Sequence, residues 1–231
     1  MGRRLTIRRK LTIRRRPGLA GAALLRGCMI FCMGCCMAGY MSGCTTNVVV
    51  EGSLPTPLVE QIPVRIGVHY TEDFRNFSHE EKLDEAGTWN IALGSQNLSF
   101  FQTLFAKLFV SVREVGELPL SAEEMAGLDG ILVPTIAKYG FLPPAVSGLK
   151  FYSASIEYHV ALYDVANAKV GEWMIVGYGK SEGGMFTGDD AMNEATMLAI
   201  RDGGARIAIE LINQPGVQKW IKRLPQEGGV R

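Results

Sequence analysis

The feature that most constrains this fold is a regular alternation of apolar and polar side chains over residues 151–165 (FYSASIEYHVALYDV). Even-numbered positions such as Ile156 and Val160 are apolar, whereas odd-numbered positions such as Ser155 and Glu157 are polar. Successive side chains of a β-strand point to opposite faces of the sheet, so this pattern predicts a long strand with one buried and one wet face. Such strands are typical of antiparallel sheets.

Residues 164–170 (DVANAKV) indicate a turn after this strand, and residues 171–180 predict its hairpin partner. Residues 93–110 predict an amphipathic helix, because leucine and phenylalanine recur three and four positions apart. A second long helix is expected to end near Asn213. Its Gly203-Gly204 pair should either kink the helix or let it approach the sheet closely.

The other expected elements are shorter. They are strands at 64–70, 112–115 and 130–139, a small helix that Ser121 caps, and a last helix from Pro215 to about Arg223. Residues 71–88 are polar and predict a long loop. The order of elements predicts an α+β fold with a mostly antiparallel sheet and helices packed on one face.

The first 43 residues have the composition of an export signal. Residues 1–26 contain nine arginines or lysines and no acid, and the 17 residues of 27–43 carry no charge. A basic segment, an apolar stretch and small residues before a cut are typical of a secretory signal peptide. The apolar stretch is shorter than the ~20 residues that a spanning helix needs, although an uncleaved N-terminal anchor helix is the alternative.

This stretch ends in Met41-Ser42-Gly43-Cys44, which resembles the lipobox of bacterial lipoproteins, with Met41 in the place of the usual leucine. The resemblance implies cleavage before Cys44 and a lipid on Cys44 that attaches the protein to a membrane. An acid at the next position commonly retains Gram-negative lipoproteins in the inner membrane. Thr45 at that position implies the outer membrane, with the domain facing the periplasm.

Removing the leader changes both thiol content and charge. All five cysteines lie at or before position 44, so the remaining domain has no free thiol and no disulfide, which suits an oxidising compartment. The whole chain has 24 basic and 23 acidic residues, and without the nine basic residues of the leader the net charge is −8. Nucleic-acid binding is therefore not expected, because it depends on Lys and Arg that neutralise phosphates.

The composition along the chain predicts four segments. They are a lipoprotein signal peptide at 1–43, a flexible tether at 44–62, a single α+β domain at 63–225 and a disordered tail at 226–231. The tether is expected because residues 44–62 contain two prolines and no long hydrophobic period, with an early strand at Val48–Val50 as the alternative.

No pattern in the sequence predicts catalysis, a cofactor or a metal site. Gly179-Lys180-Ser181 matches the end of a phosphate-binding loop, but Met174 stands where that motif requires glycine, and the tripeptide ends a strand. The three histidines are far apart in sequence, and neither a nucleophilic serine motif nor a nucleophilic cysteine remains after the leader. We therefore expect a protein that is not an enzyme.

An apolar stretch at 140–150 (GFLPPAVSGLK) lies between two expected strands. Loops usually run over the surface, and exposed apolar patches often mark interfaces. The stretch therefore indicates either an interface or a lid over one end of the core. The candidate interface residues are Phe141, Leu142, Pro143, Pro144 and Val146.

Four stretches carry a resemblance to a known group. They are Ile66-Gly67-Val68, the helix at 99–110 with the strand at 112–115, Leu128-Asp129-Gly130-Ile131-Leu132-Val133, and residues 155–173 with Asp164, Gly171 and Trp173. Over most of 63–213 the chain resembles the small envelope lipoproteins of the YajG type and, more loosely, the TolB N-terminal-domain fold. The resemblance implies a periplasm-facing domain that assists envelope complexes, and it carries no catalytic residues.

The sequence thus predicts a lipid-anchored, non-catalytic interaction or scaffold module of the bacterial cell envelope. Its expected partners are the membrane, through lipidated Cys44, and an envelope protein. The alternative is a transport-auxiliary lipoprotein that binds a lipid or another apolar molecule between helix and sheet. The sequence indicates neither the identity of the partner nor the oligomeric state.

Overall fold

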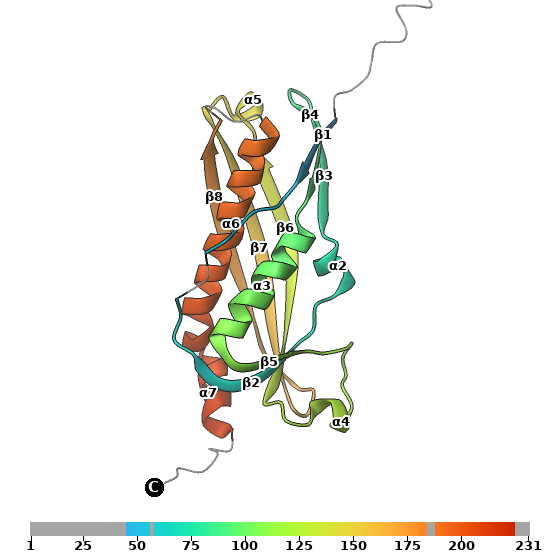
Figure 1. Cartoon of the computed structure of the whole chain (residues 1–231), viewed down its shortest axis with the longest axis vertical. Helices are drawn as coiled ribbons and strands as arrows, with labels where there is room; N and C mark the ends of the chain where they lie inside the picture. The colour runs from blue at the N-terminus through green and yellow to red at the C-terminus, as the bar shows by residue number, and fades with distance from the viewer. Residues whose placement is uncertain (1–44, 56–57, 184–187, 225–231) are drawn as a thin grey trace, which may run out of the picture. The chain divides into compact units, whose positions relative to one another are not determined.

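The computed structural model describes residues 45–55, 58–183 and 188–224 (Figure 1). All of them belong to one compact unit, Cys44–Arg231. The predicted signal peptide, its Met41-Ser42-Gly43-Cys44 motif and the tail at 226–231 lie outside the described residues. No helix in the described part of the chain is both long and apolar enough to cross a membrane.

A five-stranded sheet has the strand order β5-β2-β6-β7-β8. Its members are β2 (Ile62–Val68), β5 (Phe109–Glu114), β6 (Gly130–Leu142), β7 (Phe151–Asp164) and β8 (Lys169–Glu182). β2 runs parallel to β5 and β6, whereas the longer β6–β7 and β7–β8 ladders are antiparallel. The predicted α+β class is confirmed, and so is the β7–β8 hairpin.

A second sheet was not expected. It has three strands in the order β1-β4-β3, with bounds β1 (Thr45–Val49), β3 (Ser78–Leu83) and β4 (Gly87–Ala92). The long loop predicted at 71–88 is therefore wrong, because it forms the short helix α2 (Glu72–Arg75), β3 and the start of β4. β3 has no buried residue, so its polar sequence shows no hydrophobic period.

The tether predicted at 44–62 also needs correction, because β1 pairs in parallel with β4 directly after position 44. Val48 and Val50 are buried in the core. The backbone of Glu51 exchanges two 3.1 Å hydrogen bonds with the side chain of Asn193. The segment is too short for its two buried valines to produce a clear strand pattern in the sequence.

Two helices, α3 (Gly94–Leu108) and α6 (Gly188–Glu210), cover one face of the large sheet (Figure 1). The β7 side chains that were predicted to face inward, from Ala154 to Leu162, are buried beneath them. At Gly203 and Gly204 a Cβ atom would meet the rings of Tyr158 and Phe100 at 2.7 and 2.1 Å. Of the two predicted roles of the glycine pair, close approach to the core is therefore confirmed.

The opposite face of the sheet is covered at one end only. There the capped helix α4 (Ala122–Met125) helps to form a small second core from Leu120, Met125 and Ile131. The predicted capping box is present, since Ser121 and Glu124 exchange side-chain and backbone hydrogen bonds. The chain continues through α5 (Pro144–Ser147), the 3-10 turn η1 (Leu211–Asn213) and α7 (Pro215–Arg223), whose Trp220 is buried against the body.

Candidate interaction surface

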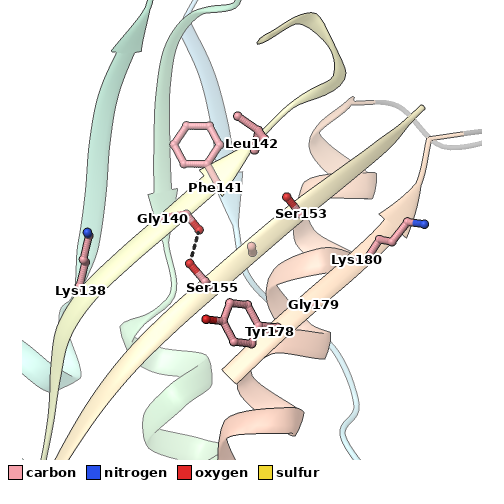
Figure 2. A pocket seen from close by; sticks show the side chains of 10 residues that line it. Lys138, Gly140, Phe141, Leu142, Ser153, Ser155, Tyr178, Gly179 and Lys180 are labelled. Carbon is pink, nitrogen blue, oxygen red and sulfur yellow. Dashed lines mark hydrogen bonds between the residues drawn. The ribbon is translucent and has the colours of Figure 1, made fainter. Parts of the chain in front are cut away.

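An open groove of about 580 Å³ lies on the helix-free face of the large sheet, near the end that carries α5 (Figure 2). We call it the distal groove. Three adjacent strands contribute its outward side chains. They are Lys138, Gly140 and Leu142 from β6, Ser153 and Ser155 from β7, and Tyr178 and Lys180 from β8.

The groove exists because its floor is made of small residues. Gly140 and Ser155 are cross-strand partners, and the Ser155 hydroxyl donates to the Gly140 carbonyl oxygen at 3.5 Å (Figure 2). Ser155 in turn pairs with Tyr178, whose exposed ring forms one wall. A glycine and serines between larger neighbours leave a depression in an otherwise pleated surface.

A β-bulge in β6 decides which side chains face the groove. The β6–β7 register shifts between Ile136 and Lys138, so one extra residue is inserted there. Beyond the bulge the even-numbered positions of β6 face outward, which exposes Leu142 and turns Phe141 to the opposite, core-facing side of the sheet. Without the bulge the two side chains would exchange faces, because the side-chain period of a strand is two residues.

Two lysines give the groove a positive rim. Lys138 and Lys180 stand on different strands on either side of the serines (Figure 2). The Lys180 ammonium lies 4.0 Å from the centroid of the Phe151 ring, a cation–π contact that holds its stem against the sheet. The carboxylate of Glu157 is the cross-strand neighbour of Lys138 and hydrogen-bonds His159 at 3.1 Å.

Of the predicted interface residues, Phe141 belongs to the core side of the sheet. Its ring packs among Trp89, His79 and Tyr139, at centroid distances of 5.6, 5.9 and 6.2 Å. The Tyr139 hydroxyl shares a 2.7 Å hydrogen bond with Thr196, and burial raises the pKa of Tyr139 well above its ordinary value. Phe141 thus contributes to a packed aromatic cluster beneath the groove.

The other predicted residues divide between core and surface. Pro143 is buried and Pro144 is half-buried as the first residue of α5. Leu142 is 38% exposed and Val146 is 36% exposed, and Leu149 beyond them is also exposed. The stretch is therefore divided, with Phe141 and Pro143 covering the core as a lid and Leu142 and Val146 at the surface.

The histidines and acids do not gather into a site. In residues 45–55, 58–183 and 188–224, no three His, Cys, Asp or Glu side chains lie close enough together to hold a metal ion. Lys180 and Ser181 of the rejected phosphate-loop match lie on an antiparallel strand. Gly179 lies on the same strand, β8, and packs so closely against α6 that a Cβ atom at this position would clash with the helix backbone.

Comparisons with known proteins give no family. The chain matches no family model and no curated protein. Among solved structures, a Xanthomonas campestris protein described as a DUF330 protein has a TM-score of 0.48 at 12% identity, covering 78% of this chain and 98% of its own.

Two further structures are similar. A Helicobacter pylori homologue of a neuraminyllactose-binding hemagglutinin has a TM-score of 0.39 at 15% identity, covering 76% of this chain and 97% of its own. A Chlamydia trachomatis hypothetical protein has a TM-score of 0.34 at 12% identity, covering 67% and 96%. All three TM-scores lie below 0.5, so they support no assignment of family or activity, and the YajG-type resemblance stays a prediction.

Proposed function

We propose that this protein is a lipid-anchored, periplasm-facing, non-catalytic interaction or scaffold module of the bacterial cell envelope. The observation that carries the proposal is the distal groove, with exposed apolar side chains at Leu142, Val146 and Leu149 beside it. Open depressions rimmed by apolar and charged side chains are typical of protein contact sites. The signal-peptide composition and the lipobox-like Cys44 motif support the membrane attachment and the compartment.

A matched pair of variants at the groove tests the interaction. Leu142→Asp places a charge at an exposed position that faces the partner, so it should remove partner capture while leaving folding intact. Phe141→Asp should instead destabilise the domain, because it puts a charge into the aromatic cluster. The measurement is affinity purification of the full-length chain from its own envelope, with urea unfolding of each variant. Unchanged capture by the Leu142→Asp variant would count against this surface.

Anchoring is tested separately at Cys44. Cys44→Ala should leave a precursor that is neither cut nor lipidated, visible as a larger mass and as loss of metabolic labelling with a fatty acid. A variant of unchanged size that still carries the label would show that the lipid is attached elsewhere or that the leader is not a lipoprotein signal.

The alternative function, a carrier of a lipid or another apolar molecule, finds support at a different place from the one predicted. The phenylalanines of α3 pack against core rings, as Phe101 does against Tyr158 at 5.1 Å, and so do not line a cavity. A separate apolar groove of about 390 Å³ lies between residues 58–63 and the ends of α3 and α6. Ile209 in its wall is 66% exposed.

Native mass spectrometry of the full-length protein distinguishes the two functions. Co-purified lipid that is lost in an Ile209→Asp variant would support the carrier. A clean mass for the protein alone, together with partner capture that depends on Leu142, supports the interaction module.

A further inference from the structure

The outward side chains of β8 form a row that complements itself. Because Ile175, Gly177 and Gly179 face the helices, the even-numbered residues face away from them. The row reads Glu172, Met174, Val176, Tyr178 and Lys180. Val176 is at the centre of the row. A large apolar side chain flanks it on each side, and beyond these the row ends in an acidic residue at one end and a basic residue at the other.

We propose that a second copy of this chain binds to this row in antiparallel orientation, around a twofold axis at Val176. This axis lies between the two sheets and perpendicular to the strands, so the row of the second copy runs in the opposite direction. Met174 of each copy therefore faces Tyr178 of the other. Glu172 of each copy likewise faces Lys180 of the other. Two sulfur–aromatic contacts and two ion pairs therefore form at once.

The large apolar side chains of the row are exposed to solvent, as expected for a contact surface. Met174 and Tyr178 are each 62% exposed, although both are large apolar side chains on a central part of the strand. They lie four residues apart on one strand, about 13 Å. Val176 is half-buried between them, so the three form a continuous apolar strip.

The charges at the two ends are held at the surface. Lys180 extends over the Phe151 ring, and Glu172 bonds the Lys169 ammonium at 2.6 Å. Beside Val176, on the neighbouring strands, Glu157 of β7 and Lys138 of β6 lie side by side and carry opposite charges. The proposed axis runs along this line of three residues, so Glu157 and Lys138 of one copy lie opposite the same residues of the other, and each carboxylate then has an ammonium neighbour in both copies at a centre with no net charge.

The face of β8 is available for this contact, whereas its edge is occupied by α6 at Tyr178. The Tyr178 backbone N–H, which would otherwise point to a new strand, donates to the Asp202 carboxylate of α6 at 3.0 Å. Side chains that occupy the backbone groups of an edge strand prevent further strands from pairing. We therefore expect two copies that meet at β8 to stack their sheets face to face, about 10 Å apart.

The size of the face predicts a weak dimer. The row from Glu172 to Lys180 spans about 27 Å, and the three bare strands are about 10 Å across. This footprint, about 270 Å² per copy, is below the ~1,200 Å² of total area that stable specific interfaces bury, so we expect a weak dimer with monomer and dimer in exchange. The inference goes beyond the proposed function, which rests on the distal groove and the exposed apolar side chains beside it. Because Tyr178 and Lys180 also form the β8 wall of the distal groove, the second copy would border that groove.

Charge-reversal variants of the full-length chain in detergent test the proposal by light scattering across a concentration series. Lys180→Glu and Glu172→Lys should each raise the dissociation constant of the dimer about tenfold, because each replaces two attractions by two repulsions. An equimolar mixture of the two variants should recover wild-type association, since a heterodimer restores both ion pairs. Lys219→Glu, an exposed change on α7, is the control that should have no effect.

A wild-type protein that is monomeric at every concentration overturns the proposal. So does a mixture that associates no better than its two components, because only an antiparallel contact pairs position 172 with position 180. Leu142→Asp should leave the molecular mass unchanged while removing partner capture. Glu172→Lys, which lies outside the distal groove, should weaken the dimer and leave capture intact, so failure of one proposal is distinguishable from failure of the other.

Discussion

Replacing Gly179 by alanine would force α6 away from β8. A Cβ atom at this position would lie 1.9 Å from the Ala195 carbonyl oxygen and 2.5 Å from the Ala199 backbone nitrogen. Both atoms belong to the helix backbone, so no side-chain rotation relieves the contact. Reaching the 3.0 Å below which such contacts are essentially never seen requires a separation of about 1.1 Å.

That separation would loosen one of the best-packed parts of the core. Ala195, Ala199 and Ile200 of α6 have no exposed surface, so a shifted helix loses contacts along its length. Overpacking of a core by a methyl group typically costs 1–3 kcal/mol, and a clash with backbone lies at the upper end, about 3 kcal/mol. The conformational preference of alanine over glycine in a strand offsets at most about 1 kcal/mol of this.

Urea unfolding followed by tryptophan fluorescence measures the effect, because Trp89, Trp173 and Trp220 all lie in the domain. With a net loss of about 2–3 kcal/mol and a slope of about 2 kcal/mol/M, the midpoint should fall by about 1–1.5 M. Gly140→Ala is the matched control, since its Cβ would lie 3.3 Å from a Ser155 hydroxyl that can rotate. The reasoning is refuted if Gly179→Ala leaves the midpoint in place, or if the control loses as much.

Two further changes test the end of the sheet that carries α4. Asn167 has φ of 59° and bridges to Leu120, accepting from its N–H at 3.0 Å and donating to its carbonyl at 3.1 Å. Asn167→Ala should therefore cost about 2–3 kcal/mol in urea unfolding, and Asn167→Gly about 1 kcal/mol less, because glycine keeps the backbone conformation; equal losses would assign the whole effect to the bridge. At α4, hydrogen bonds from the Ser121 backbone N–H and then from its hydroxyl lower the pKa of Glu124. A carboxyl whose folded pKa is depressed stabilises the fold above its unfolded pKa and loses that contribution as pH falls through the folded pKa. An NMR titration should find the Glu124 pKa below its ordinary value and, in Ser121→Ala, raised but still low because the backbone N–H remains; an ordinary pKa in the unaltered protein would contradict the capping geometry.

The sequence predicted those elements whose two faces differ in chemistry. β7 was predictable because each inward position from Ala154 to Leu162 is apolar and the outward positions up to His159 are polar. α3 was predictable from its stripe of leucine and phenylalanine. β3 (SHEEKL) has no buried residue, and β1 has only Val48, so neither produces a period that distinguishes a strand from a loop.

The candidate site was only partly predictable, because it depends on register. Residues such as Leu142 and Val146 were named from their apolar character alone. The distal groove needs Gly140, Ser155 and Tyr178 to lie side by side, which the ladders determine but the linear sequence does not. The bulge after Ile136 also reverses the parity of β6, so the sequence could not assign Leu142 to the surface and Phe141 to the core.

The early start of β1 bears on how this domain would move in a membrane. A flexible tether over 44–62 would let the domain wander with an r.m.s. excursion of about 24 Å. With the proposed lipid on Cys44, a single peptide link, about 3.8 Å long, instead joins the anchor to Thr45, which pairs with Thr88 of β4. The domain would then diffuse in two dimensions with its lipid and keep a narrow range of heights above the bilayer. A partner in the same membrane would meet it at a nearly constant level, which favours contacts between proteins that share one leaflet.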